Sequence, residues 1–276
     1  MKHFLLITLF SLITTFAFAK EPNVLVSIAP QKFLVEKITN KRAAIQVLVP
    51  QSFSSHTYEP TIKEMIRATK ADIWFCIGEP FEKKIQPALS QSMQIVEITE
   101  GVDLIESSCG PGKCCHGTHD PHIWLSALLL KQQAKVIVDQ LIQLAPENRS
   151  FYLANYEKLT EELDALHHEI QTMVAGKKNG TILVSHPAFA YFCRDYTMQQ
   201  LSIEMEGKEP SPRYTTQLID QARQADIRCI FVQKQFPLKG VQAIQRALGA
   251  TLVEIDPYNE NVIANLKTIA SAIEAS

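Results

Sequence analysis

The chain has 276 residues, of which 46% are hydrophobic and 20% are charged, and its formal net charge is −2. Both signs of charge are spread along the chain, so no electrostatic feature indicates a nucleic-acid partner. Six cysteines are too few and too unevenly spaced for a disulfide scaffold. The length suits two lobes better than one domain, and the apolar content predicts an ample core.

The first residues have the features of a secretory signal peptide. Lys2 precedes an apolar run from Phe4 to Phe18, and 17–19 is a small-x-small triplet. We predict cleavage after Ala19, so that 1–19 is the signal peptide. No later apolar stretch reaches the roughly 20 residues that a membrane span needs, and no cysteine at the cleavage site offers a lipid attachment point. We therefore expect a periplasmic chain.

Short apolar runs alternate with longer amphipathic stretches, which is typical of β-α units around a parallel sheet. The predicted fold class is therefore α/β, with a parallel sheet in each half of the chain. The candidate strands are 23–29, 44–49, 72–77, 94–99, 181–185, 199–203, 227–233 and 251–256.

The two halves contain weak repeats that keep the same order. The matched pairs are 24–27 with 182–185, 70–73 with 224–227, and 95–98 with 252–255. Each pair lies at a predicted strand, although strand composition alone makes such matches common. Three of them in order favour two similar lobes with a common β-α plan.

One long helix is predicted between the lobes, over 146–176. Its apolar residues recur at a spacing of three to four: Leu153, Tyr156, Leu159, Leu163, Leu166 and Ile170. Pro146 suits its first turn and Gly176 its end. The predicted division is thus an N-terminal lobe over 20–145, the linking helix, and a C-terminal lobe over 177–276. A single stiff helix predicts small lobe shifts rather than wide hinge closure.

Four polar residues lie just after predicted strands or at the start of a helix. They are His56, His122, His186 and Asp256. Ligands of open α/β sheets collect at the carboxyl ends of strands, so these side chains can converge in the interlobe cleft. Three imidazoles and one carboxylate suit tetrahedral zinc, whereas more carboxylate oxygens would favour manganese. Taken alone, a histidine in such a position is more often a structural or surface residue than a ligand. Asp256 before Pro257 is as typical of a turn former as of a ligand.

The segments around these residues resemble a known family. They are Ser55-His56-Thr57-Tyr58-Glu59-Pro60, Asp120-Pro121-His122-Ile123-Trp124-Leu125 and Ser185-His186-Pro187-Ala188-Phe189-Ala190-Tyr191-Phe192, with weaker support from Glu209-Pro210-Ser211-Pro212 and Asp256-Pro257. The whole mature chain resembles the cluster A-I solute-binding proteins, the zinc and manganese receptors of bacterial ABC importers, and most of all their periplasmic zinc-binding type. The resemblance implies His56, His122, His186 and Asp256 as the metal ligands.

The resemblance also implies a function. We expect a monomeric receptor, not an enzyme, that binds one Zn(II) per chain and delivers it to a membrane permease, with no small organic substrate and no nucleic acid. Two alternatives stay open: a manganese or iron receptor of the same family, and a periplasmic zinc hydrolase. The hydrolase would need an open metal position and a base such as Glu59 or Glu204. Glu59 is otherwise a candidate to accept the N–H of a ligating imidazole, or a helix N-terminal charge.

The segment 109–119 concentrates further metal-binding residue types. It contains Cys109, Cys114, Cys115, His116 and His119. In one interpretation this loop gathers zinc and passes it to the main site. In the other, two of the three cysteines pair, because exported thiols oxidise, and both histidines are merely exposed.

The remaining cysteines and histidines are predicted to have no part in the site. Cys76 and Cys229 lie in apolar strands and are expected to be small buried hydrophobes. A disulfide between Cys193 and Cys229 is the alternative. His167 and His168 lie on the long helix, where we expect both to be solvated.

Overall fold

The computed structural model of this chain describes residues 21–106, 119–204, 210–236 and 239–276. The predicted signal peptide lies outside the described residues, as do the three cysteines and His116 of the 109–119 segment. His119 is described, and it is exposed and forms an isolated antiparallel bridge with Glu106. Among the helices that the model describes, none is both long and apolar enough to cross a membrane.

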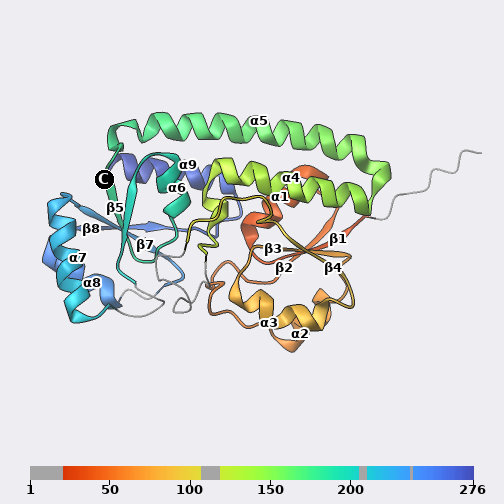
Figure 1. The fold of residues 1–276 in the computed structure, drawn as a ribbon, viewed down its shortest axis with the longest axis horizontal. Coiled ribbons are helices and arrows are strands. Elements are labelled where there is room, and N and C mark those ends of the chain that lie inside the picture. The colour runs from red at the N-terminus through yellow and green to blue at the C-terminus, as the bar shows by residue number, and fades with distance from the viewer. Residues whose placement is uncertain (1–20, 107–118, 205–209, 237–238) are drawn as a thin grey trace, which may run out of the picture.

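Two four-stranded parallel sheets form the frame of the molecule (Figure 1). The first has the order β2-β1-β3-β4, and the second has the order β6-β5-β7-β8. Their strands are β1 (Asn23–Val26), β2 (Ala44–Val47), β3 (Ile73–Cys76), β4 (Gln94–Glu97), β5 (Thr181–Val184), β6 (Gln199–Ser202), β7 (Cys229–Gln233) and β8 (Thr251–Ile255). Every predicted strand is therefore confirmed, and each observed strand lies within its predicted range.

The repeats found in the sequence fall on equivalent strands of the two sheets. The first pair matches β1 with β5, the second precedes β3 and β7, and the third matches β4 with β8. In both sheet orders these strands occupy the same positions. The two lobes thus share one plan, as the order of the repeats predicted.

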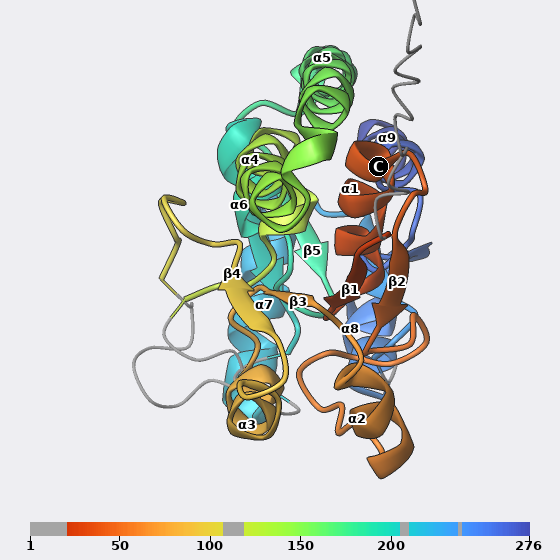
Figure 2. The same cartoon turned by 90° about the vertical axis from the view of Figure 1, so that its right-hand side faces the viewer.

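Helices surround both sheets. They are α1 (Ala29–Thr39), α2 (Ile62–Ala68), α3 (Pro80–Leu89), α4 (Ala127–Leu144), α5 (Arg149–Met173), α6 (Ala190–Asp195), α7 (Pro212–Gln224), α8 (Lys239–Leu248) and α9 (Val262–Glu274). In Figures 1 and 2, α1, α4 and α9 lie between the sheets and α5, whereas α2 and α3 lie at the opposite end of the molecule from α5. α7 and α8 flank the second sheet.

The predicted long helix is α5, and it joins the two lobes. It has 25 residues, which corresponds to a length of about 37 Å. Its predicted first turn, Pro146–Asn148, is a 3-10 turn rather than α-helix. The buried residues Leu159, Leu163, Leu166 and Ile170 recur at helical spacing and face α1, α4 and α9.

The largest hydrophobic core cluster among the described residues extends across both halves of the chain. Val24 of β1, Leu130 of α4, Leu163 of α5 and Leu266 of α9 belong to the same buried cluster. A smaller cluster packs under the second sheet. Because α9 comes from the C-terminal end, packs against α5 and shares this cluster with residues of β1 and α4, separating the lobes would expose part of the shared core. The packing therefore opposes wide opening, as the long helix alone had predicted.

Candidate metal site

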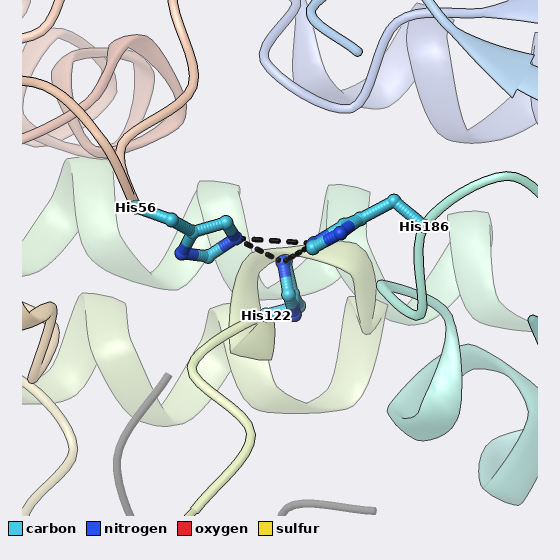
Figure 3. Close-up of side chains that lie close together, drawn as sticks. All are labelled: His56, His122 and His186. Atoms are coloured by element: carbon cyan, nitrogen blue, oxygen red, sulfur yellow. Dashed lines mark hydrogen bonds between the residues drawn. The ribbon is translucent and has the colours of Figure 1, made fainter. Parts of the chain in front are cut away.

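Three imidazole rings meet between the lobes (Figure 3). The Nε2 atom of His56 lies 3.3 Å from that of His122 and 3.1 Å from that of His186. The third separation, between His122 and His186, is 3.4 Å. Three residues spread over more than a hundred positions of sequence thus direct the same ring atom to one point.

Each histidine is presented by a different part of the fold. His56 lies in the loop that follows β2, and His186 follows β5 by two residues. His122 precedes a 3-10 turn over Ile123–Leu125, after which Ser126 caps α4 by accepting the N–H of Leu129 at 3.1 Å. Within each parallel sheet the carboxyl ends of the strands share one edge, so His56 after β2 and His186 after β5 both extend from the carboxyl edges of their sheets, and their rings meet between the lobes.

The site is shielded from water. The side chains of His56 and His122 are 2% exposed, and that of His186 is 1% exposed. Phe236 stacks on His186 with ring centroids 4.0 Å apart, and Trp124 lies 5.1 Å from His122. Burial lowers the local dielectric constant, so a cation held between these rings would be attracted strongly to its ligands.

Each imidazole is bonded to its own carboxylate through Nδ1. His56 donates to Glu79 at 2.9 Å, His122 to Asp120 at 2.6 Å, and His186 to Glu204 at 2.8 Å. A carboxylate acceptor places the ring proton on Nδ1, which leaves the Nε2 lone pair for a metal. The three Nε2 lone pairs therefore point toward one another, and a metal cation bound between them would stabilise this arrangement.

Two of these carboxylates have shifted pKa values. Burial opposes the ionised form of Glu79, but the neighbouring His56 and a hydrogen bond from Ser55 outweigh it and lower the pKa of this carboxyl below its ordinary value. Burial raises the pKa of Glu204 to about 7, an effect that the neighbouring His56 offsets only in part. The site thus contains at least one carboxylate that stays ionised while completely buried.

The spacing of the rings fits a tetrahedral metal ion. Zinc–nitrogen bonds of about 2.0 to 2.1 Å at the tetrahedral angle place two ligand nitrogens about 3.3 Å apart. The three measured separations, 3.1, 3.3 and 3.4 Å, lie around this value. Among the described residues, these three form the group of candidate ligands whose atoms all lie within 4.8 Å of one another.

Asp256 is not a member of that group, and its carboxylate has other partners. Oδ2 accepts a hydrogen bond from Gln51 Nε2 at 3.1 Å. Oδ1 accepts one from Gln235 Nε2 at 2.9 Å and one from the backbone N–H of Tyr258 at 3.1 Å. The bond to Tyr258 agrees with the turn-forming alternative for Asp256, and its role as a fourth ligand stays a prediction.

The sequence did not identify all carboxylate partners of the histidines. Glu59 does not take this role, because its side chain is 80% exposed and lies 3.6 Å from Lys84. Glu79 has that role instead, and the local signal for it was its place three residues after the buried strand β3, directly before α3. In the sequence, Asp120 was identified as the first residue of the Asp-Pro-His segment. Glu204 was considered only as a candidate base in the hydrolase alternative.

The structure corrects two further expectations. His168 is exposed as predicted, but His167 stacks on Tyr196 with ring centroids 5.3 Å apart, and its Nδ1 atom is buried. The alternative of a disulfide between Cys193 and Cys229 is wrong, because both residues are free thiols. Cys76 is buried as expected, and Cys229 is half-buried.

The sequence of this chain matches a known protein family over nearly its whole length. Residues 24–275 match the family described as zinc-uptake complex component A, periplasmic. The chain belongs to this family. Its members are substrate-binding receptors of ABC transporters and not enzymes, which confirms the predicted class and excludes the hydrolase alternative.

Individual relatives are similar to this chain to different degrees. A "Putative metal-binding protein" of Chlamydia trachomatis is 34% identical, covering 97% of this chain and 98% of the relative. A ZnuA deletion mutant crystallised with zinc bound is 34% identical, with a TM-score of 0.85 over 92% of this chain and 96% of its own. The "Manganese-binding lipoprotein MntA" of Halalkalibacterium halodurans is 25% identical over 72% of this chain and 67% of its own length. Both metals therefore occur in the names of relatives.

Proposed function

We propose that this receptor captures Zn(II) and delivers it to the permease of an ABC importer. The observation that carries the proposal is the convergence of three buried Nε2 atoms, each on a ring whose Nδ1 atom is bonded to a carboxylate. Hydrogen bonds from Nδ1 to a carboxylate orient imidazoles that bind metal through Nε2 and increase the basicity of these rings. The three imidazoles are the proposed ligands, and Asp256 is the proposed fourth.

Zinc is favoured over manganese by the type of ligand atom. Imidazole nitrogen suits zinc, whereas manganese prefers carboxylate, carbonyl and water oxygens. Here the carboxylates of Glu79, Asp120 and Glu204 accept hydrogen bonds from the imidazoles. The candidate ligand atoms that lie close together belong to the three histidines. The zinc-bound ZnuA relative supports the same choice. The manganese-binding relative makes manganese the second candidate.

The proposed function includes a place and a partner. The chain acts in the periplasm after cleavage behind Ala19, as a monomer that holds one metal ion. The permease of the importer is its membrane partner. The lobes 20–145 and 177–276, joined by the helix over 146–176, are the proposed units between which the ion is bound.

Metal titration of the mature protein, stripped with a chelator, tests this proposal. We expect one Zn(II) to bind tightly, and Mn(II) to bind at least about a hundredfold more weakly because of the nitrogen ligands. His122→Ala should abolish tight binding. His168→Ala is the matched control, since His168 is exposed on α5 and should leave binding unchanged. Tighter binding of Mn(II) than of Zn(II) would reject the zinc assignment.

A further inference from the structure

A group of hydrogen bonds joins the two lobes beside the histidines. Gln51 Nε2 donates to Oδ2 of Asp256 at 3.1 Å. Gln235 Nε2 donates to Oδ1 of Asp256 at 2.9 Å and to the backbone carbonyl of Gln51 at 3.0 Å. Gln51 follows β2 of the first sheet, whereas Gln235 and Asp256 follow β7 and β8 of the second. We call these three residues the interlobe triad.

The interlobe triad lies nearer the solvent than the imidazoles do. Gln51 is exposed, and Gln235 and Asp256 are half-buried, whereas the rings of the site are buried. Two members are the chain neighbours of residues that flank the site. Phe236, next to Gln235, stacks on His186, and Pro257, next to Asp256, accepts the indole N–H of Trp124 at 2.9 Å. The interlobe triad therefore borders the site on its more exposed side.

The hydrogen bonds of Asp256 leave room for a metal ion. A carboxylate has about four lone-pair positions, and three donors occupy this one: Gln51, Gln235 and the backbone N–H of Tyr258. Carboxylates that bind metals commonly accept hydrogen bonds at the same time. The two glutamines can thus restrain Asp256 at the more exposed side of the site whether or not an ion is bound.

A second, buried connection lies beneath the interlobe triad. The hydroxyl of Tyr258 lies 2.8 Å from Ser55 Oγ, which donates to Glu79 at 2.7 Å. Glu79 in turn accepts from His56. The turn that carries Asp256 is therefore fixed to the His56 segment from inside, so that breaking the exposed bonds of the glutamines should free Asp256 without separating the lobes.

Building on the proposed metal-binding function, we propose that Gln51 and Gln235 are positioning residues that hold Asp256 at the more exposed side of the site and slow the release of metal. Neutral amide donors suit this role, because they bond the carboxylate without adding a charge that would repel an arriving cation. Loss of either donor leaves Asp256 less restrained and the bound ion less covered.

Release kinetics of the full mature protein test this proposal. Gln51→Ala and Gln235→Ala, loaded with Zn(II) and mixed with excess chromophoric chelator, should release metal about five- to tenfold faster than the wild type, as expected for lost hydrogen bonds to a charged acceptor. Gln51→Met keeps the approximate size of the side chain and removes the donor without adding a charge, so its acceleration should be about as large as that of Gln51→Ala. Gln94→Ala is the matched control, because it removes one exposed hydrogen bond that a side-chain amide donates. Gln94, at the start of β4, donates this bond to Gln140 at 2.7 Å.

The outcomes separate the two proposals. Release rates within about twofold of the wild type in both glutamine variants, with tight zinc binding intact, would overturn the role of the interlobe triad alone. Equal acceleration in Gln94→Ala would also overturn it, because the effect would not be specific to these bonds. If the wild type failed to bind zinc tightly, the proposed function would be rejected, and the role of the interlobe triad, which depends on it, would be rejected too.

Discussion

Nδ1 of His122 donates to Oδ1 of Asp120 at 2.6 Å, across only one intervening residue, Pro121. The same oxygen also accepts the backbone N–H of His122 at 2.9 Å. One carboxylate oxygen therefore fixes both the ring and the backbone of this residue. Proline between them restricts the chain, so local contacts orient the ring that faces the other two imidazoles.

Asp120→Asn should weaken zinc binding about tenfold to a hundredfold, the usual cost of losing the carboxylate behind a metal-bound histidine. The neutral amide supports the ring less well and reduces the basicity of Nε2. Competition titration against a chelator of known affinity measures this change. Asp164→Asn is the control, since Asp164 lies on α5, is half-exposed and forms an ion pair with Lys131 of α4. An affinity equal to that of the wild type in Asp120→Asn would argue against carboxylate support.

Zinc affinity should fall steeply as the solution becomes more acidic. Protons and the metal compete for the Nε2 lone pairs, and free imidazole titrates near about 6.5. The metal-free site therefore binds more protons than the loaded site below this value, so lowering the pH favours metal loss. Between about pH 7.5 and about pH 5.5 we expect the affinity for zinc to drop by more than about a hundredfold for three ligands. Isothermal titration in several buffers measures both the affinity and the protons released; a constant affinity over this range would contradict a three-histidine site.

Metal loading should change the overall dimensions of the protein little. α5 spans both lobes, and one hydrophobic core includes residues of α4, α5 and α9. Solution scattering should give radii of gyration near about 18 Å for both states, differing by less than about 0.5 Å. A clear decrease on adding zinc would show a wide closure, which the shared core is expected to prevent.

The packing of α5 should contribute substantially to stability. Leu166 is 1% exposed within the shared core, so Leu166→Ala should lower the free energy of unfolding by about 2 to 5 kcal/mol. Leu144→Ala is the control; this side chain is 37% exposed and should cost less than about 1 kcal/mol. Urea denaturation of metal-free protein measures both changes. Equal effects of the two substitutions would contradict the assignment of Leu166 to the core.

Local patterns in the chain were sufficient for the frame of the molecule. Strand length, apolar runs and helical spacing are short-range properties, and they predicted the eight strands and α5. The repeats also predicted that β1, β3 and β4 correspond to β5, β7 and β8. The positions of His56 and His186 after strands and of His122 before a helix allowed these side chains to converge, and the resemblance to a known family singled out the three that the structure brings together.

Contacts between distant segments were decided only by the tertiary structure. Glu79 reaches His56 from 23 residues further along the chain, whereas Glu59, three residues from the same histidine, turns to solvent. Gln51 meets Asp256 across 205 residues, which no local spacing could indicate. Sequence patterns report which face of an element is apolar and where it ends. The partner of a polar side chain depends instead on how the loops of two lobes pack, and that is set by the whole fold.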